Sequence, residues 1–312
     1  MEPSADFEAI ARLAAAAGGK VEPEGNTWTV RRASDPRRDG GAAVDVGESG
    51  FAARLALAWA LCRPGETSVA GGGTLSRRDC SDAVPRGADD PAVLRRVEWA
   101  GRPGFLPARI RPGPVPRAVQ LASRRSGQPL SAWILCAAGG WGPARIRWEG
   151  PILSEGHLAL TVSLVRRFGG TGGRAPDGGW EVSPVRDAVD EAVPRDATQA
   201  GVFVLAALAA GRPVRIPGIR LDDPQPDAAF LRLLAERGAG VRNGPDGLRV
   251  DPARIPDVGG AYDSMPDAVP AAAVLAILGG VPAVLTGVAR LREKESDRLA
   301  ALREELERVG AR

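Results

Sequence analysis

The sequence predicts an α/β protein built from a repeated unit of about seventy residues. Four apolar helical segments are each followed by a short strand that ends in glycine, at Gly71, Gly150, Gly218 and Gly287. A second piece, an amphipathic helix followed by an extended hairpin, recurs between them. Such fixed-period similarity means that each unit packs against its neighbours, because one unit alone cannot bury its apolar face.

The first piece of each unit is a helix of small apolar residues, and a helix that is apolar nearly all round is expected to be buried. The four copies lie at residues 50–61, 131–138, 200–209 and 270–278. A glycine or a Pro-Gly pair ends each helix, and the strands that follow are expected at 67–71, 144–150, 213–218 and 283–287.

The second piece is an amphipathic helix that stops at glycine. Phe7, Ile10 and Leu13 mark its first copy at 5–17, which leads into a hairpin at 21–30 with a turn at 24–26. Further copies are expected at 158–182, 228–250 and 297–312, and the copy near 85–100 is interrupted by Pro85 and Gly87. Because the array begins late in one unit and ends early in another, we expect an incomplete chain whose second domain leaves apolar helix faces exposed and aggregates.

Two domains are expected, 1–194 and 195–312, because a Pro- and Asp-rich stretch at 183–195 has the composition of a linker. The net charge of +3 comes from arginines scattered along the chain, which argues against a nucleic-acid-binding tail. Three widely spaced cysteines indicate neither a disulfide framework nor a zinc site, and Cys62 and Cys136 are expected in the core. No apolar run reaches about 18 residues, so we expect a cytoplasmic protein without a membrane span.

The run Lys294-Glu295-Ser296-Asp297-Arg298 is the most distinctive stretch of the chain. All but two of the 41 basic side chains are arginine, and the exceptions are Lys20 and Lys294. A lysine within a cluster of opposite charges indicates a site that needs a compact, titratable ammonium. The simpler alternative is a helix start with Ser296 as its cap, and the two interpretations are compatible.

Polar residues also precede each apolar helix, at 48–50, 126–128, 196–199 and 263–267. Helix capping is the simplest explanation for Asp196 and for Ser264. It does not explain Arg54, because a buried arginine needs an anionic partner. Arg54, Arg78 and Arg298 together form a candidate clamp for a phosphate or carboxylate group. Asp267 and Glu295 are candidate general acid/base groups, whereas the single histidine, His157, gives no metal site.

These motifs, in this order, resemble the 3-phosphoshikimate 1-carboxyvinyltransferases, the EPSP synthase family. The run at 294–298, with Pro266-Asp267-Ala268 before it, is the most specific element. Weaker matches are 50–54 (Gly-Thr-Ala-x-Arg in the family), 73–78 (Gly-x-x-Leu-x-x-Arg), 126–128 (Ser-Ser-Gln), 154–157 (Ser-x-x-Tyr) and 225–227 (Gln-Gly-Asp). The resemblance implies the enolpyruvyl transferase fold, in which βαβαββ units form two domains, here with the second incomplete.

The resemblance also implies a reaction of the shikimate pathway of aromatic amino-acid biosynthesis. The enolpyruvyl group of phosphoenolpyruvate would pass to the 5-hydroxyl of shikimate 3-phosphate, with Asp267 as base and Glu295, aided by Lys294, as proton donor. The implied contacts of shikimate 3-phosphate are Ser126, Gln128, Ser154, Asp267 and Lys294. Those of phosphoenolpyruvate are Gly50, Arg54, Arg78, Gln128 and Arg298. No cofactor, metal, nucleic acid or membrane is implied, and a monomer is expected.

The sequence departs from the family pattern at several positions. Phe51, Gly127 and His157 replace a threonine, a serine and a tyrosine, and the family's Pro-Gly-Ser-Lys-Ser and Asp-His-Arg segments are absent. At roughly 2.7–4 kcal/mol for each missing donor, this partial chain is expected to be nearly inactive. Two alternatives stay open: a UDP-N-acetylglucosamine enolpyruvyl transferase, in which Cys80 would react with an epoxide, and a non-catalytic remnant that binds a phosphorylated ligand or a partner protein.

Overall fold

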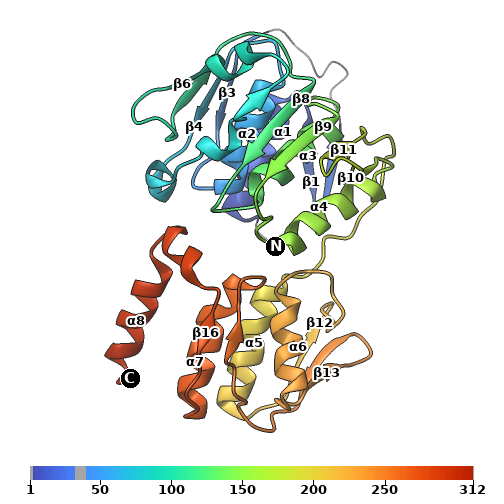
Figure 1. The fold of residues 1–312 in the computed structure, drawn as a ribbon. Coiled ribbons are helices and arrows are strands. Elements are labelled where there is room, and N and C mark those ends of the chain that lie inside the picture. The colour runs from blue at the N-terminus through green and yellow to red at the C-terminus, as the bar shows by residue number, and fades with distance from the viewer. Residues whose placement is uncertain (1–2, 32–39, 312) are drawn as a thin grey trace. The chain divides into compact units, whose positions relative to one another are not determined.

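The computed structural model describes residues 3–31 and 40–311, which fold into an α/β protein (Figure 1). The chain divides into two compact units. Unit 1 holds residues 1–152 and 161–189, and unit 2 holds residues 153–160 and 190–312. The predicted boundary between 194 and 195 assigns residues 153–160 and 190–194 to the first domain, whereas the structure groups both segments with unit 2. The predicted division into domains 1–194 and 195–312 stays a prediction.

The first complete repeat lies in unit 1 and follows the order β-α-β-β-β. Its elements are β3 (Ala42–Asp45), α2 (Gly50–Leu61), β4 (Thr67–Ala70), β6 (Val97–Trp99) and β7 (Ala108–Ile110). The strands lie in the order β3-β4-β7-β6, with β3 parallel to β4 and the others antiparallel. Where an amphipathic helix would precede the hairpin, the chain has the 3-10 helix η3 (Pro91–Arg96), as the interrupted pattern near 85–100 predicts.

The second repeat has the same topology with its amphipathic helix in place. Its four main strands lie in the order β8-β9-β11-β10, with β8 parallel to β9 and the short β5 at the outer edge. Helix α4 begins with residues of unit 2 and continues in unit 1. The elements are β5 (Gly87–Ala88), β8 (Ala118–Ala122), α3 (Gln128–Ala138), β9 (Arg145–Glu149), α4 (Glu155–Arg167), β10 (Gly172–Arg174) and β11 (Trp180–Val182).

The predicted first helix and hairpin are confirmed. They form α1 (Ala5–Ala16), β1 (Lys20–Glu24) and β2 (Thr27–Arg31). The Phe7 ring lies 4.6 Å from the ring of Trp28, so the helix and the hairpin pack on each other. Two more 3-10 helices in unit 1, η1 (Gly73–Arg77) and η2 (Ser81–Ala83), form the loop that follows β4.

The apolar helices α2 and α3 form the centre of unit 1 and pack against each other. Their residues are almost all buried, as their composition predicts. The indole nitrogen of Trp133, which has no exposed surface, donates a hydrogen bond of 2.9 Å to the carbonyl oxygen of Ala83. Cys62 and Cys136 are buried here and free, as predicted.

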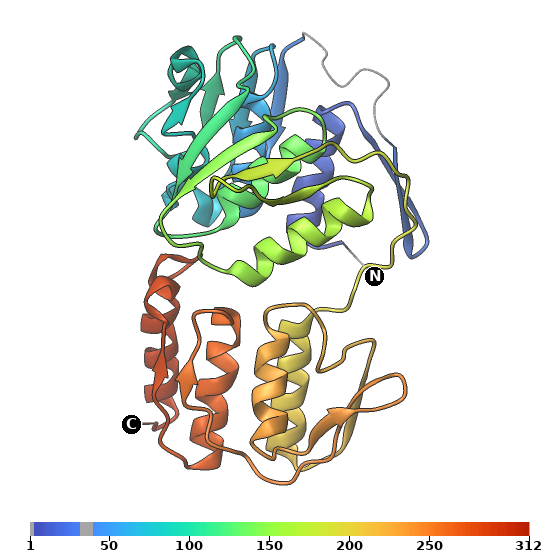
Figure 2. The same ribbon diagram turned by 45° about the vertical axis from the view of Figure 1, so that its right-hand side comes forward.

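Unit 2 places three helices side by side with α8 beyond α7 (Figures 1 and 2). The antiparallel sheet β12-β14-β13 repeats the order of the last three strands of each repeat in unit 1, and β15 pairs with β16 in parallel. The elements are α5 (Ala197–Ala210), β12 (Val214–Pro217), α6 (Ala228–Glu236), β13 (Val241–Asn243), β14 (Gly247–Val250), β15 (Gly260–Ala261), η4 (Pro266–Ala268), α7 (Val269–Gly279), β16 (Leu285–Thr286), η5 (Ala289–Glu293) and α8 (Arg298–Arg308).

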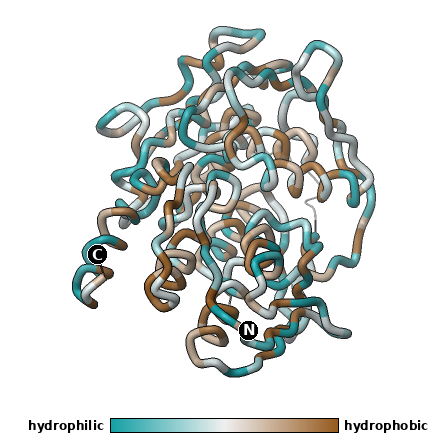
Figure 3. The backbone as a smooth tube through the Cα atoms, turned by 60° about the horizontal axis from the view of Figure 1, so that its bottom comes forward, coloured by the Kyte–Doolittle hydropathy of each residue, from teal (hydrophilic) through white to brown (hydrophobic). Residues whose placement is uncertain are grey.

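Helices α5 and α7 differ from α2 and α3 because each leaves part of its apolar surface exposed. Val202, Phe203 and Leu278 are 53%, 59% and 51% exposed. The prediction that all four apolar helices are buried is therefore wrong for α5 and α7. The prediction that the second domain leaves apolar helix faces exposed is confirmed. The apolar helical runs are brown in Figure 3, and the polar loops are teal. In the part of the chain that the structure describes, no helix is long and apolar enough to cross a membrane.

The exposed apolar side chains are expected to promote self-association and to contribute little to the free energy of unfolding. The double variant Phe203→Gln/Leu278→Gln is expected to scatter less light at high concentration, with the free energy of unfolding changed by about 0.5 kcal/mol or less. Val204→Ala is the matched control, because the neighbouring Val204 is fully buried and its truncation should cost about 2 kcal/mol. Unchanged scattering by the double variant would show that these exposed side chains do not cause self-association.

Candidate functional site

The residues predicted to bind ligands fall into two groups, one in each unit. Unit 1 contains Gly50, Arg54, Arg78, Ser126 and Gln128. Unit 2 contains Ser154, Asp267, Lys294, Glu295 and Arg298. Within each unit these side chains come from segments that lie far apart in the sequence.

Arg54 has the anionic partner that its burial requires. Its guanidinium Nε lies 3.0 Å from Oδ1 of Asp82, and the two side chains are 6% and 9% exposed. Its Nη1 donates to the carbonyl oxygen of Gly50 at 3.0 Å, and its Nη2 to Asp82 Oδ2 and to the carbonyl oxygen of Asp79 at 3.3 Å. Four of the five N–H groups of Arg54 therefore have acceptors among the described residues, so a ligand can use the second N–H of Nη1 or replace one of these acceptors.

Asp82 also links Arg54 to the start of α3. Its Oδ2 accepts a hydrogen bond of 2.9 Å from the hydroxyl of Ser123. The Ser123 oxygen in turn accepts from the backbone N–H of Ser126, whose own hydroxyl accepts from the backbone N–H of Gln128. The predicted contacts Arg54, Ser126 and Gln128 thus belong to one hydrogen-bonded network.

Gly50 and Arg78 lie in direct contact at the N-terminal end of α2. A side-chain Cβ at position 50 would come within 2.4 Å of Nη2 of Arg78, so a larger residue there would displace this guanidinium. Ser49 caps the helix by accepting from the N–H of Ala52 at 3.3 Å. Arg78 is held over a helix start, where the positive end of the backbone dipole also favours an anion.

In unit 2, Asp267 lies between two cations. Its Oδ1 is 2.5 Å from Nη1 of Arg298 and 3.5 Å from Nζ of Lys294. The other terminal nitrogen of Arg298 is 2.8 Å from Oε2 of Glu295. The structure therefore brings together the four charged residues of this unit that the sequence predicts.

This arrangement keeps Asp267 ionised. Burial by itself raises the pKa of Asp267, but the charges of Lys294 and Arg298 and their hydrogen bonds outweigh it, so the pKa is lowered. An ionised carboxylate accepts hydrogen bonds and protons, and the two cations beside it can hold an anionic ligand. In the described residues, no cluster of three or more histidine, cysteine or carboxylate side chains could hold a metal ion.

Local structure explains how these side chains are placed. Lys294 follows η5 directly, and Asp297 caps α8 by accepting from the N–H of Ala300 at 2.9 Å, so the prediction of Ser296 as cap is wrong. Ser264 is not a cap either, because α7 is preceded by η4 and has no side-chain cap bond. Asp196 caps α5, as predicted, through the N–H groups of residues 198 and 199.

His157 and Ser154 lie at the start of α4, beside the charged group of unit 2. Protein atoms around the imidazole displace water and lower the pKa of His157, with further lowering by Lys294 and Arg290. Asp227 and Asp267 act in the opposite direction. Asp227 is 7% exposed and accepts from the hydroxyl of Thr198, and burial raises its pKa.

Three residues of this arrangement were not predicted from the sequence: Asp82, Asp227 as a neighbour of His157, and Arg290. Arg290 donates from Nη1 to the hydroxyl oxygen of Ser154 at 2.8 Å and from Nη2 to the carbonyl oxygen of Asp263. The sequence places Arg290 four residues before Lys294. This closeness to the predicted site was the available indication that Arg290 belongs to it. Gln225 has a structural role, because its side chain binds the backbone at 195 and 197.

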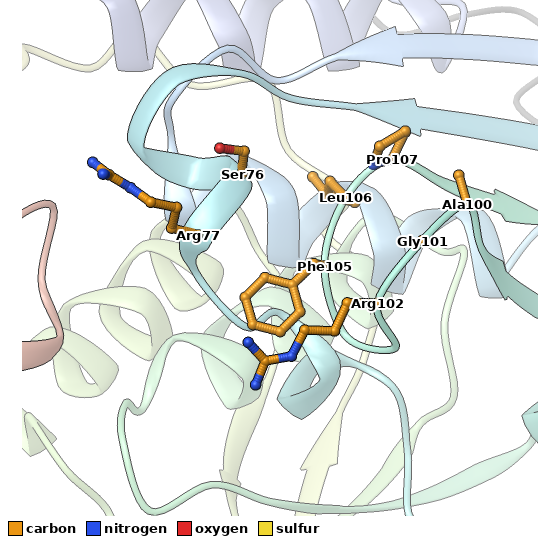
Figure 4. A pocket seen from close by; sticks show the side chains of 8 residues that line it. All are labelled: Ser76, Arg77, Ala100, Gly101, Arg102, Phe105, Leu106 and Pro107. Atoms are coloured by element: carbon orange, nitrogen blue, oxygen red, sulfur yellow. The ribbon is translucent and has the colours of Figure 1, made fainter.

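A pocket of about 440 Å³ lies elsewhere in unit 1, between η1 and the loop that joins β6 to β7 (Figure 4). The guanidinium of Arg102 lies over the ring of Phe105, with 4.3 Å between the guanidinium carbon and the ring centre. Arg77 points away from the other lining side chains. None of the predicted ligand contacts lines this pocket, so it adds nothing to the two charged groups.

The sequence of this chain matches a known protein family. The family model of EPSP synthase (3-phosphoshikimate 1-carboxyvinyltransferase) matches residues 3–312. The chain is 32% identical over 298 residues to the 3-phosphoshikimate 1-carboxyvinyltransferase of Laribacter hongkongensis, covering 91% of this chain and 65% of the relative. The Bordetella pertussis enzyme of that name is 31% identical over 288 residues, with 85% and 63% covered. The chain thus spans just under two thirds of these relatives.

Solved structures confirm the predicted fold. An EPSP synthase structure from Acinetobacter baumannii superposes with a TM-score of 0.69 at 20% identity, over 98% of this chain and 71% of that one. A second structure from the same organism gives 0.65 at 19% identity, with the same coverage. The predicted enolpyruvyl transferase fold of repeated βαβαββ units is the fold of these structures.

The buried ion pair predicts a large and specific loss of stability. Asp82→Ala leaves the Arg54 guanidinium without its anion, and the free energy of unfolding is expected to fall by about 3–5 kcal/mol in denaturant titrations. Glu66→Ala is the control, because Glu66 pairs with Arg109 at 2.6 Å on the exposed surface and should cost about 1 kcal/mol or less. Equal losses in the two variants would refute the importance of the buried pair.

The charges around His157 predict opposite shifts of its pKa in two variants. As the single histidine, it gives one resolvable imidazole Hε1 signal for an NMR titration. We expect a pKa below the ordinary value of 6.5. Asp227→Asn removes a negative charge that favours the imidazolium and should lower the pKa further, whereas Lys294→Met removes a positive charge and should raise it. Shifts in the same direction would show that these side chains do not act on His157 through their charge.

Proposed function

Because the chain belongs to the EPSP synthase family, we propose that it transfers the enolpyruvyl group of phosphoenolpyruvate to the 5-hydroxyl of shikimate 3-phosphate. The observation that carries this proposal is the ionised Asp267 held between Lys294 and Arg298. A carboxylate can accept the proton of an attacking hydroxyl, and the cations beside it suit two phosphorylated substrates.

The proposed reaction has two steps. The 5-hydroxyl oxygen attacks C2 of phosphoenolpyruvate and passes its proton to Asp267, while Glu295, aided by Lys294, donates a proton to C3. The tetrahedral intermediate then loses phosphate, which takes up the proton held by Asp267, while a proton passes from C3 back to Glu295 and the double bond forms again. Arginine and lysine side chains among the proposed contacts would stabilise the negative charge on the leaving phosphate, since preorganised cations are most effective where charge develops.

The substrate contacts proposed from the family pattern differ in how far their side chains are already hydrogen-bonded to other protein groups. Gly50 and Arg78 are in contact at the start of α2, and Gln128 begins α3, so each of the three lies at a helix start, which supports their assignment to phosphoenolpyruvate. Arg54 already donates four hydrogen bonds to internal acceptors, so it would act on the ligand through its remaining N–H on Nη1, by an exchange of partners, or by fixing Asp82 and Gly50. For shikimate 3-phosphate we propose Ser126, Gln128, Ser154, Asp267 and Lys294.

The environment of Cys80 argues against the related transfer to UDP-N-acetylglucosamine. That alternative assigns reactivity to Cys80, whose thiol would need a lowered pKa and access to the ligand. Cys80 has no exposed surface, and burial raises its pKa. We therefore prefer shikimate 3-phosphate as acceptor. The proposal includes a monomeric protein in the cytoplasm, as the sequence predicts.

The direct test is phosphate release with both substrates present. We expect slow release, because the sequence predicts a nearly inactive chain, and we expect it to need phosphoenolpyruvate and shikimate 3-phosphate together. Asp267→Asn should lower that slow rate by about 100-fold or more, because loss of a general base has that effect. Asp257→Asn is the matched control, since Asp257 lies on the exposed surface near Arg237, and it should change the rate less than about twofold.

The outcomes separate the alternatives. Binding of shikimate 3-phosphate without turnover would favour the non-catalytic remnant over the enzyme. Release of phosphate with UDP-N-acetylglucosamine as acceptor, and not with shikimate 3-phosphate, would support the related transferase. An absence of both binding and turnover would overturn the proposal.

A further inference from the structure

Glu48 is an acidic residue beside the proposed phosphoenolpyruvate contacts of unit 1, and the proposed reaction does not use it. It lies between the end of β3 and the start of α2, two residues before Gly50. Its Oε2 accepts two hydrogen bonds from Thr74, one from the backbone N–H at 2.9 Å and one from the hydroxyl at 2.8 Å. Thr74 lies in η1, and η1 leads directly to Arg78. One carboxylate oxygen therefore joins the start of α2 to the segment that carries Arg78.

The hydrogen bonds of Glu48 extend a connection that the backbone begins. Strands β3 and β4 are parallel neighbours, so the segments that follow them leave the same edge of the sheet. The N–H of Val46 donates to the carbonyl oxygen of Ala70 at 2.9 Å. The N–H of Gly72 donates to the carbonyl oxygen of Gly47 at 2.9 Å. The side chain of Glu48 continues this connection into η1.

The contact between Glu48 and η1 is close. Gly73 has a φ of 53°, a conformation that favours glycine, and a Cβ at this position would collide with the carboxylate of Glu48. The two hydrogen bonds from Thr74 lower the pKa of Glu48, so the carboxylate is ionised at neutral pH. Hydrogen bonds to an ionised carboxylate are stronger than those between neutral groups.

The segment that Glu48 holds ends at Arg78. Leu75 is fully buried, and its carbonyl oxygen accepts from the backbone N–H of Arg78 at 3.0 Å, so the core of unit 1 holds one side of η1. Nη1 of Arg78 lies 3.5 Å from the carbonyl oxygen of Glu48, and its guanidinium lies against Gly50. Because Leu75 is independent of Glu48, loss of the Glu48 carboxylate is expected to shift Arg78 without unfolding the unit.

We propose that Glu48 is a positioning residue that holds the guanidinium of Arg78 where phosphoenolpyruvate binds. The inference rests on the proposed function, because it takes phosphoenolpyruvate as the anion at Arg78. The negative charge of Glu48 repels an anionic substrate. The hydrogen bonds of Glu48 to Thr74 and its charge therefore act on binding in opposite directions, and two neutral variants separate them.

A ³¹P NMR titration of phosphoenolpyruvate, and in parallel of inorganic phosphate, with the whole chain measures binding without turnover. Glu48→Gln removes the charge and keeps an oxygen acceptor for Thr74, so it should bind phosphoenolpyruvate at least as tightly as the unchanged chain. Glu48→Ala also removes the charge but loses both hydrogen bonds. Its dissociation constant should therefore exceed that of Glu48→Gln by about three- to tenfold. Thr74→Val should weaken binding with the charge in place, and Thr74→Ser should restore it.

Asp89→Ala is the matched control. Asp89 is an exposed carboxylate of unit 1 that accepts from the backbone N–H of Arg117 at 3.0 Å, and residues 87–97 include no predicted ligand contact. Its loss should leave the dissociation constant of phosphoenolpyruvate unchanged. All of these variants should bind shikimate 3-phosphate equally, because Arg78 is not among its proposed contacts.

Each outcome decides a different point. Equal dissociation constants of phosphoenolpyruvate for Glu48→Gln and Glu48→Ala would overturn the inference and leave the proposed function intact. A difference between these two variants for inorganic phosphate, without binding of phosphoenolpyruvate, would support the positioning of Arg78 and overturn the proposed function. An equal loss of affinity for phosphoenolpyruvate and shikimate 3-phosphate would show that Glu48 acts on the fold, and would overturn its positioning role. Binding of neither phosphoenolpyruvate nor inorganic phosphate would overturn both the inference and the proposed function.

Discussion

Four helices of this chain carry almost no polar side chains along their length, and this constraint decides where its chemistry can lie. Helices α2 and α3 are buried on nearly all sides, so a polar group within them needs its own internal partner. Arg54 meets that condition through Asp82. The remaining polar residues gather at the helix starts, where backbone N–H groups also point outward. The two charged groups follow from this packing, because the repeat places a helix start at the same position in each unit.

The charged groups of unit 1 and unit 2 differ in how many of their charged side chains are paired with other protein groups. In unit 1, Arg54 donates four hydrogen bonds to internal oxygens, and the guanidinium of Arg78 lies against Gly50, where a side chain would displace it. In unit 2, Asp267 is shared by Lys294 and Arg298, whereas Arg290 meets only neutral oxygens. Unit 1 thus holds a buried, preformed ion pair, whereas in unit 2 three cations, Lys294, Arg298 and Arg290, act on Asp267. An anionic substrate with a hydroxyl to activate fits the second group.

Local patterns made most of the fold predictable. Apolar periodicity and glycine stops lie within a few residues of each other, so the helices and the hairpins at 21–30, 172–182 and 241–250 follow from the sequence. The residue pattern did not predict β3, β8 and β15, which are only two to five residues long and depend on partners elsewhere in the sheet. The charged run at 294–298 was predictable because lysine is rare here. Arg54 with Asp82 and Arg290 with Ser154 were not, since 28 and 136 residues separate these partners.

Lys294 is a proposed contact of the acceptor substrate. Because Lys20 and Lys294 are the two lysines, protein labelled with ¹⁵N-lysine gives two backbone amide signals, and Lys20 in β1 is an internal control. Titration with shikimate 3-phosphate should shift the Lys294 signal in a saturable manner and leave the Lys20 signal in place. A Lys294 signal that stays fixed at saturating ligand, or equal shifts of both signals, would contradict the account.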